Sequence, residues 1–106
     1  MMQKNNQIKN LILDHKITIF IKGTKHKPLC SFSSQAIEIM NKFAIDYYIV
    51  NVLEDKKIRH EVKKYSNWPT IPQLYIDGEF IGGTDIIRSL HVEGKLEEML
   101  EKALNS

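Results

Sequence analysis

The hydrophobic positions of this chain first follow the spacing of an amphipathic helix and then that of a strand. Ile8, Leu11 and Ile12 recur at intervals of three and four residues, which predicts a helix over roughly residues 3–15 with one face on a core. Residues 17–22 are rich in β-branched and aromatic side chains and predict a buried strand. The first two expected elements are therefore a helix and a strand.

The next two apolar segments predict a second helix and a second strand. Residues 31–43 carry apolar side chains at helical spacing, with polar residues on the opposite side. The apolar positions are Phe32, Ala36, Met40 and Phe43, and the polar ones are Gln35, Glu38 and Lys42. Residues 46–52 are again rich in β-branched and aromatic side chains. Two strands joined by one helix predict a parallel pair with a right-handed crossover.

A third helix and a hairpin follow. Residues 55–66 have helical spacing, whereas residues 68–73 contain two prolines and should be irregular. The apolar runs 74–76 and 80–81 flank an Asp-Gly pair, which is a strong signal for a two-residue hairpin turn. The hairpin adds an antiparallel pair to the sheet.

The last part of the chain predicts two more helices. Thr84 and Asp85 are suitable N-caps for a helix that runs through Leu90, and a terminal helix should follow Gly94. The expected order places a four-stranded mixed sheet between helices on both faces, which is an α/β architecture. We expect residues 1–106 to form one domain.

Composition and charge narrow the class of protein. A hydrophobic fraction of 42% and a charged fraction of 26% are ordinary for a soluble globular protein. The longest apolar run, residues 17–21, is bounded by lysines and is too short to span a membrane. Residues 1–64 hold twelve Lys and Arg against six Asp and Glu, whereas residues 65–106 hold three against seven. The basic half favours an anionic partner, although most of these lysines could simply be solvated.

The single cysteine, Cys30, lies between the first expected strand and the second helix. A helix N-terminus and the nearby Lys22, Lys25 and Lys27 would favour its thiolate. The alternative is an inert buried cysteine that packs as a small hydrophobic residue. One cysteine forms no internal disulfide, and no secretory leader is expected, so a reducing cytoplasmic compartment is favoured.

Three sequence motifs follow one another along the chain. They are Lys-Gly-Thr at 22–24 followed by Pro-Leu-Cys-Ser-Phe-Ser at 28–33, Trp-Pro-Thr-Ile-Pro-Gln at 68–73, and Asp-Gly-Glu-Phe-Ile-Gly-Gly-Thr-Asp-Ile at 77–86. Together they resemble a monothiol glutaredoxin of the Cys-Gly-Phe-Ser type, over essentially the whole chain. The resemblance implies a thioredoxin-like fold that binds glutathione.

The resemblance also implies cationic contacts to the carboxylates of glutathione. Lys22 would lie beside the thiol and pair with one carboxylate. Arg59 would reach the glycyl carboxylate from the third helix, because a guanidinium can donate two parallel hydrogen bonds. Lys63 is an open candidate for the same contact. The alternative for each is a solvated surface cation.

Backbone contacts are implied at the other two motifs. A cis bond between Ile71 and Pro72 would leave the backbone N–H and C=O of Ile71 free to pair with the extended tripeptide. Thr84 and Asp85 would receive the γ-glutamyl end, with N–H groups on its carboxylate and the Asp85 side chain on its amino group. Both residues could instead be plain N-caps. We interpret Phe32 and Trp68 as packing residues.

The number of thiols constrains the mechanism. Residue 33 is serine, so a mixed disulfide on Cys30 must be resolved by an external thiol such as a second glutathione. A [2Fe–2S] cluster needs four ligands. The resemblance implies that two Cys30 thiolates and two glutathiones supply them in a glutathione-bridged homodimer. The four histidines show no metal-ligand spacing, and no zinc site is expected.

Two functions follow from these expectations. The first is a carrier that transfers [2Fe–2S] to apo iron–sulfur proteins, with BolA-like proteins as further partners. The alternative is a glutathione-dependent oxidoreductase that reduces protein–glutathione mixed disulfides through Cys30. Ser31 stands where this branch of the family usually has glycine, and Cys-Ser-x-Ser also resembles a group with more oxidoreductase character. Nucleic-acid binding is not indicated, because the sequence lacks a basic patch interleaved with aromatic residues.

Overall fold

The computed structural model describes residues 4–106, and the first residue of the helix expected from residue 3 lies outside that range. Nine helices and strands are formed in these residues. In chain order they are α1 (Lys4–Leu13), β1 (Ile17–Ile21), α2 (Ser31–Met40), β2 (Tyr48–Asn51), α3 (Lys56–Ser66), β3 (Gln73–Ile76), β4 (Glu79–Gly82), α4 (Thr84–Val92) and α5 (Lys95–Leu104).

The four strands form one mixed sheet in the order β2-β1-β3-β4. β1 and β2 are parallel, with Thr18 opposite Tyr48. β1 pairs antiparallel with β3, and β3 pairs antiparallel with β4. The parallel crossover and the antiparallel hairpin predicted from the sequence are both confirmed.

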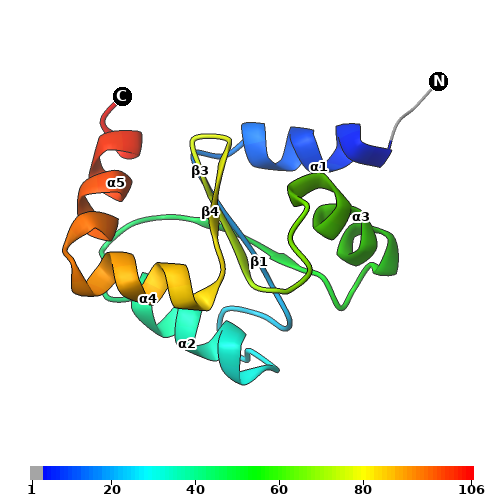
Figure 1. Ribbon diagram of the computed structural model, residues 1–106, viewed down its shortest axis with the longest axis horizontal. Coiled ribbons are helices and arrows are strands. Elements are labelled where there is room, and N and C mark those ends of the chain that lie inside the picture. The colour runs from blue at the N-terminus through cyan, green and yellow to red at the C-terminus, as the bar shows by residue number, and fades with distance from the viewer. Residues whose placement is uncertain (1–3) are drawn as a thin grey trace.

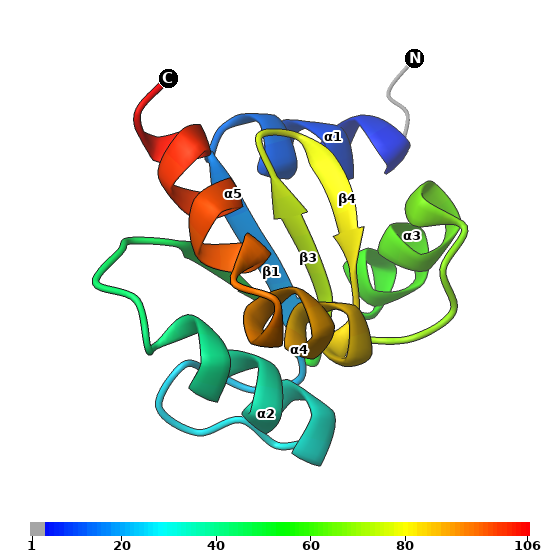
Figure 2. The ribbon, with the colours of Figure 1, turned by 60° about the vertical axis from the view of Figure 1, so that its left-hand side comes forward.

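Helices cover both faces of the sheet, as expected. α1 and α3 lie on one face, and α2, α4 and α5 lie on the other (Figures 1 and 2). All five residues of β1 are buried because the strand lies inside the sheet and between these two layers. The core is therefore divided by the sheet into two clusters. One includes Ile19, Ala36, Met40, Ile87, Leu96 and Leu100, and the other includes Ile8, Ile12, Phe20, Val62 and Tyr75.

The hairpin between β3 and β4 has the predicted two-residue turn. Asp77 and Gly78 have φ angles of +54° and +80°. Positive φ at both central residues is the geometry of a type I′ turn, which Asp-Gly adopts readily. A Cβ atom at position 78 would lie only 2.9 Å from Cδ2 of Leu13, so the turn also packs closely on α1.

Several predicted boundaries were wrong. The helix expected over 31–43 ends at Met40, with Asn41 as its C-cap, and the strand expected over 46–52 is reduced to Tyr48–Asn51. Phe43 packs on the core from the loop that follows α2. Phe32, which we placed on the buried stripe of this helix, lies in the first turn of α2 and is 55% exposed.

Candidate functional site

A closed loop carries the chain from β1 to Cys30. The N–H of Leu29 donates to the carbonyl of Lys22 at 2.9 Å, and Thr24 and Lys27 exchange backbone hydrogen bonds at 3.1 and 3.2 Å. Gly23 has a φ of +106°, and a Cβ atom there would lie 2.5 Å from the carbonyl oxygen of Lys27. The loop therefore needs glycine at this position, and it returns the chain to the end of β1.

Cys30 is the N-cap residue of α2, in an extended backbone conformation. Its pKa is lowered from the ordinary value of 9.0, chiefly by the backbone N–H of Ser33 near the sulfur. The backbone N–H of Phe32, the charge of Lys22 and the Ser33 hydroxyl lower the pKa further, whereas partial burial opposes them. The thiolate-favouring environment predicted for Cys30 is present, with Lys22 acting on the sulfur, whereas Lys25 and Lys27 are not among the groups that lower its pKa.

Ser33 has a role that sequence reasoning missed. It is fully buried, and its Oγ accepts a hydrogen bond from the backbone N–H of Lys22 at 3.1 Å. The same hydroxyl favours the thiolate of Cys30. The sequence signal was available, because a residue three positions after a helix N-cap lies one turn away on the same face.

A groove of about 220 Å³ lies beside this helix N-terminus. Its lining residues come from α2, from the loop between α3 and β3, and from the start of α4. They are Phe32, Trp68, Thr70, Ile71, Pro72, Gly83, Thr84, Asp85 and Ile86. Phe32 and Trp68 therefore line the groove, although the ring of Trp68 also packs against Phe80 with a centroid distance of 5.6 Å. The packing role that we assigned to Phe32 was wrong.

The peptide bond between Ile71 and Pro72 is cis, as expected. Both residues are buried, and both line the groove. Gly83 faces this segment, and a Cβ atom at that position would lie 3.2 Å from the carbonyl oxygen of Pro72. A glycine at position 83 therefore allows the start of α4 to approach the cis-proline segment closely.

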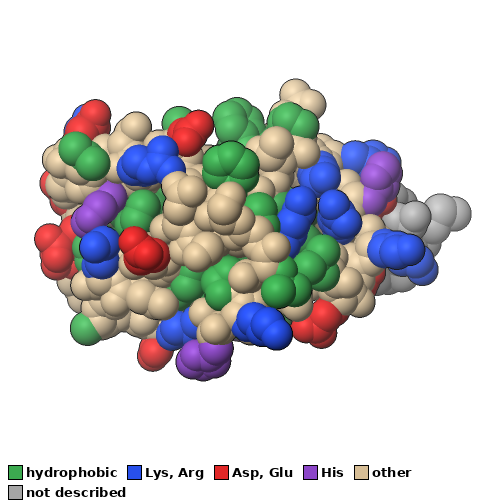
Figure 3. Space-filling model, turned by 90° about the horizontal axis from the view of Figure 1, so that it is seen from below, with side chains coloured by type: hydrophobic (Ala, Val, Ile, Leu, Met, Phe, Trp, Pro, Cys, Tyr) green, Lys and Arg blue, Asp and Glu red, His purple; other side chains and the backbone are tan. Residues whose placement is uncertain are grey.

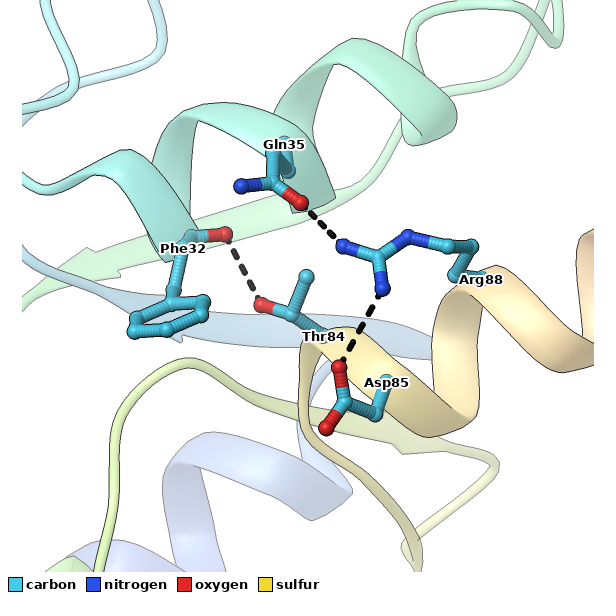
Figure 4. Close-up of polar contacts among 5 residues, drawn as sticks. All are labelled: Phe32, Gln35, Thr84, Asp85 and Arg88. Atoms are coloured by element: carbon cyan, nitrogen blue, oxygen red, sulfur yellow. Dashed lines mark hydrogen bonds and ion pairs between the residues drawn. The ribbon is translucent and has the colours of Figure 1, made fainter.

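The start of α4 differs from the expected capping pattern. Gly83 is the N-cap, and Thr84 and Asp85 occupy the first turn of the helix. The Thr84 hydroxyl donates to the carbonyl of Phe32 at 2.8 Å, so it connects α4 to α2 (Figure 4). Thr84 does not cap the helix because its side chain is 5% exposed and directed at α2.

Asp85 takes part in a polar chain that we did not predict. Nη1 of Arg88 lies 3.3 Å from Oδ1 of Asp85, and Nη2 of Arg88 donates to Oε1 of Gln35 on α2 (Figure 4). The three-residue spacing of Asp85 and Arg88 is a recognisable helix pair. No local pattern could have indicated Gln35, which is 53 residues away in the chain.

The structure brings together only some of the residues predicted for the site. Ile71, Thr84 and Asp85 line one groove, and Lys22 lies beside Cys30. Arg59 and Lys63 lie on α3, outside the set of groove-lining residues. Figure 3 views the molecule from the side of α2 and α4, and Lys and Arg side chains gather toward the end where α3 lies.

The chain has a single thiol, that of Cys30. Within residues 4–106, no three His, Cys, Asp or Glu side chains come together as a metal site. Cys30 is half-buried and is not itself a lining residue of the groove, which Phe32 reaches two positions later in the chain. Over the same residues, no helix has the length and apolar character needed to cross a bilayer.

Comparisons with known proteins agree with this geometry. The family model described as Glutaredoxin matches residues 17–81. A ycf64-like monothiol glutaredoxin of Synechocystis sp. is 48% identical over 100 residues and covers 94% of each chain. The probable monothiol glutaredoxin 2 of Rickettsia typhi is 46% identical, over 95% of this chain and 93% of the relative.

Solved structures share the fold. The solution structure of reduced apo GrxS14 from poplar has a TM-score of 0.81 and 42% identity, over 95% of this chain and 93% of that one. A buckwheat glutaredoxin–glutathione complex has a TM-score of 0.83 over 94% of this chain, with 20% identity. The matched family, the curated relatives and the thioredoxin-like fold place this chain among the monothiol glutaredoxins.

Proposed function

We propose that the groove binds glutathione with its sulfur directed toward Cys30. The observation that carries this proposal is that the groove reaches the first turn of α2 at Phe32, two residues after Cys30, whose pKa is lowered. The exposed carboxylate of Asp85 can receive the γ-glutamyl ammonium, and the first-turn N–H groups of α4 can receive the adjacent carboxylate. The backbone of Ile71 would pair with the extended tripeptide.

Cationic contacts would complete this binding mode. Lys22 acts on the Cys30 sulfur and so stands near any ligand joined to it. Arg59 is half-buried on α3, and we propose that it reaches the glycyl carboxylate from there, with Lys63 as a further candidate. The gathering of cations toward α3 supports an anionic end of the ligand on that side (Figure 3).

We further propose that the protein carries a [2Fe–2S] cluster as cargo and transfers it to apo iron–sulfur proteins. One protomer supplies one thiolate, from Cys30, and four ligands are needed. Two protomers and two bound glutathiones would supply the set in a glutathione-bridged homodimer. BolA-like proteins are proposed as partners that would replace one protomer. The half-exposed sulfur beside a ligand groove fits a shared and transferable cluster.

Anaerobic reconstitution tests the carrier function. The protein is treated with iron, sulfide and a reductant, with and without glutathione, and Cys30→Ser is treated in parallel. We expect a coloured dimer only for the wild-type protein in the presence of glutathione, by absorption and size-exclusion chromatography. A colourless monomer for the wild-type protein would contradict the proposal, as would equal cluster loading of Cys30→Ser.

Thiol–disulfide exchange is the second candidate function, and the lowered Cys30 pKa favours it. The thiolate would attack a protein–glutathione mixed disulfide, release the protein thiol and become glutathionylated, and a second glutathione would then release oxidised glutathione. A glutathione-coupled assay with a glutathionylated peptide should show turnover that Cys30→Ser abolishes. Absence of turnover at saturating glutathione would remove this candidate.

We propose a cytoplasmic location for the protein. The lone cysteine is compatible with a reducing compartment. Two relatives from Arabidopsis thaliana are named as chloroplastic and mitochondrial forms, so the family occupies several compartments. Fluorescence microscopy of the tagged protein in its own cell tests this proposal.

A further inference from the structure

Asp85 belongs both to the lining of the groove and to an ion pair with Arg88. It lines the groove, and its Oδ1 lies 3.3 Å from Nη1 of Arg88. The side chain of Asp85 is 87% exposed, so its carboxylate can accept another partner while the ion pair is formed. Arg88 lies outside the set of groove-lining residues. The contact of Arg88 with the lining of the groove is therefore its ion pair with Asp85.

Both terminal nitrogens of the Arg88 guanidinium have hydrogen-bond partners. Nη1 contacts Asp85, and Nη2 donates to Oε1 of Gln35 on the neighbouring helix α2 (Figure 4). The hydrogen bond from Thr84 to the carbonyl of Phe32 joins the same two helices one turn earlier. Because Gln35 fixes the second arm, the positive charge of Arg88 remains beside Asp85 rather than moving freely in solvent.

We propose that Arg88 is a positioning residue that sets how strongly the γ-glutamyl end of the groove selects for a free ammonium group. The inference rests on the proposed binding of glutathione, whose ammonium would contact Asp85. The negative charge of Asp85 is shared between Arg88 and that ammonium, so the ammonium gains less from Asp85 than it would from a carboxylate without a cationic partner. The neighbouring ligand carboxylate contacts backbone N–H groups instead.

A pair of ligands isolates this effect. Glutathione carries the ammonium, whereas its desamino analogue, glutaryl-cysteinyl-glycine, retains the carboxylate and lacks the ammonium. Arg88 attracts the carboxylate of both ligands equally, so that attraction cancels in the ratio of their dissociation constants. The ratio therefore reports how strongly the end of the groove at Asp85 favours the ammonium, and it includes any direct repulsion of the ammonium by Arg88. S-methyl derivatives of both ligands prevent disulfide exchange with Cys30.

Isothermal titration calorimetry measures the ratio for the wild-type protein and its variants. We expect Arg88→Ala to increase the preference for the ammonium-bearing ligand by about twofold to fivefold, the range typical of exposed ion pairs. Arg88→Lys retains the charge and should retain the wild-type ratio. Gln35→Ala releases one arm of Arg88 and should give an intermediate ratio.

A matched control comes from a second surface ion pair. Nζ of Lys95, the first residue of α5, lies 3.3 Å from Oε1 of Glu93, and neither residue lines the groove. Lys95→Ala removes one surface cation and one ion pair, as Arg88→Ala does, and should leave the ratio unchanged. Thermal unfolding of each variant establishes that it is folded at the temperature of the titration.

The outcomes separate this inference from the proposed function. An unchanged ratio in Arg88→Ala, with glutathione bound by the wild-type protein, would overturn the role of Arg88 alone. A matching increase in Lys95→Ala would also overturn it, because the effect would then come from net charge. If the wild-type protein binds neither ligand, the proposed function fails and the role of Arg88 fails with it.

Discussion

The Ser33 hydroxyl acts both on the backbone of Lys22 and on the sulfur of Cys30. Ser33 is fully buried one turn into α2, where its Oγ accepts from the N–H of Lys22 at 3.1 Å. It also helps to lower the Cys30 pKa, although the Ser33 backbone N–H contributes more. A buried donor that loses its acceptor costs about 1–3 kcal/mol. Ser33 therefore supports both the folded loop and the thiolate.

Replacing Ser33 should change both properties. In Ser33→Ala we expect the Cys30 pKa to rise toward 9.0, so that the thiolate fraction falls at any fixed pH below that value. The free energy of unfolding should fall by about 1–3 kcal/mol because the Lys22 N–H loses its acceptor. Thiolate absorbance across pH and urea unfolding measure the two effects. An unchanged titration midpoint in a destabilised variant would restrict Ser33 to a structural role.

We expect the balance between the two proposed functions to depend on Ser31. It is the first residue of α2 and is exposed, and the groups that lower the Cys30 pKa belong to Ser33, Phe32 and Lys22. We expect Ser31→Gly to lengthen the lifetime of a reconstituted cluster, because glycine removes the side chain of the residue that follows Cys30. Decay of the visible absorption in air measures this lifetime. Equal decay rates would show that residue 31 does not limit cluster stability.

At the scale of elements, the site depends on two helix N-termini held together. The hydrogen bond from Thr84 to the carbonyl of Phe32, at 2.8 Å, joins α4 to α2 close to both N-termini. α4 begins without a side-chain cap, so its first-turn N–H groups remain available to a ligand. Thr84 thus positions the helix instead of capping it.

The connection between the helices can be removed with little change in shape. Thr84→Val is expected to lower the free energy of unfolding by about 0.5–1.5 kcal/mol, the usual net value of one hydrogen bond, and somewhat more if the Phe32 carbonyl is left unpaired. It should also weaken glutathione binding, whereas Thr84→Ser should retain both properties. Urea unfolding and calorimetry provide the measurements. Full glutathione affinity in Thr84→Val would show that the groove does not need this link.

The features that the sequence predicted correctly are those set by residues close together in the chain. Burial of one face fixes the spacing of apolar residues in the helices, and the Asp77-Gly78 turn follows from the positive φ angles that these residues tolerate. The exposure of Phe32 and the link from Thr84 could not be predicted, because both depend on how α4 packs against α2. The contact between Gln35 and Arg88 joins residues 53 apart, for which a single sequence contains no signal.

At the scale of the molecule, the sheet separates two apolar clusters that must fold together. Ile12 belongs to the cluster under α1 and α3, and Leu100 belongs to the cluster under α2, α4 and α5. Both side chains are at most 1% exposed. β1 contributes to both clusters, through Phe20 on one face and Ile19 on the other. Loss of either cluster should therefore destabilise the whole chain.

Two truncations test this shared dependence. Ile12→Ala and Leu100→Ala should each lower the free energy of unfolding by about 2–5 kcal/mol, as expected for large-to-small changes in a core. Each variant should still unfold in one transition, measured by far-ultraviolet circular dichroism in urea. A separate early transition in Ile12→Ala would instead indicate that the layer formed by α1 and α3 unfolds alone.

The groove also contains its own optical reporter. Trp68 is the only tryptophan of the chain, it lines the groove, and its side chain is 37% exposed. Indole emission changes when neighbouring water is displaced, so a ligand that covers this ring should alter the intrinsic fluorescence of the whole protein. Binding and release at the groove can therefore be followed in real time on the unlabelled chain.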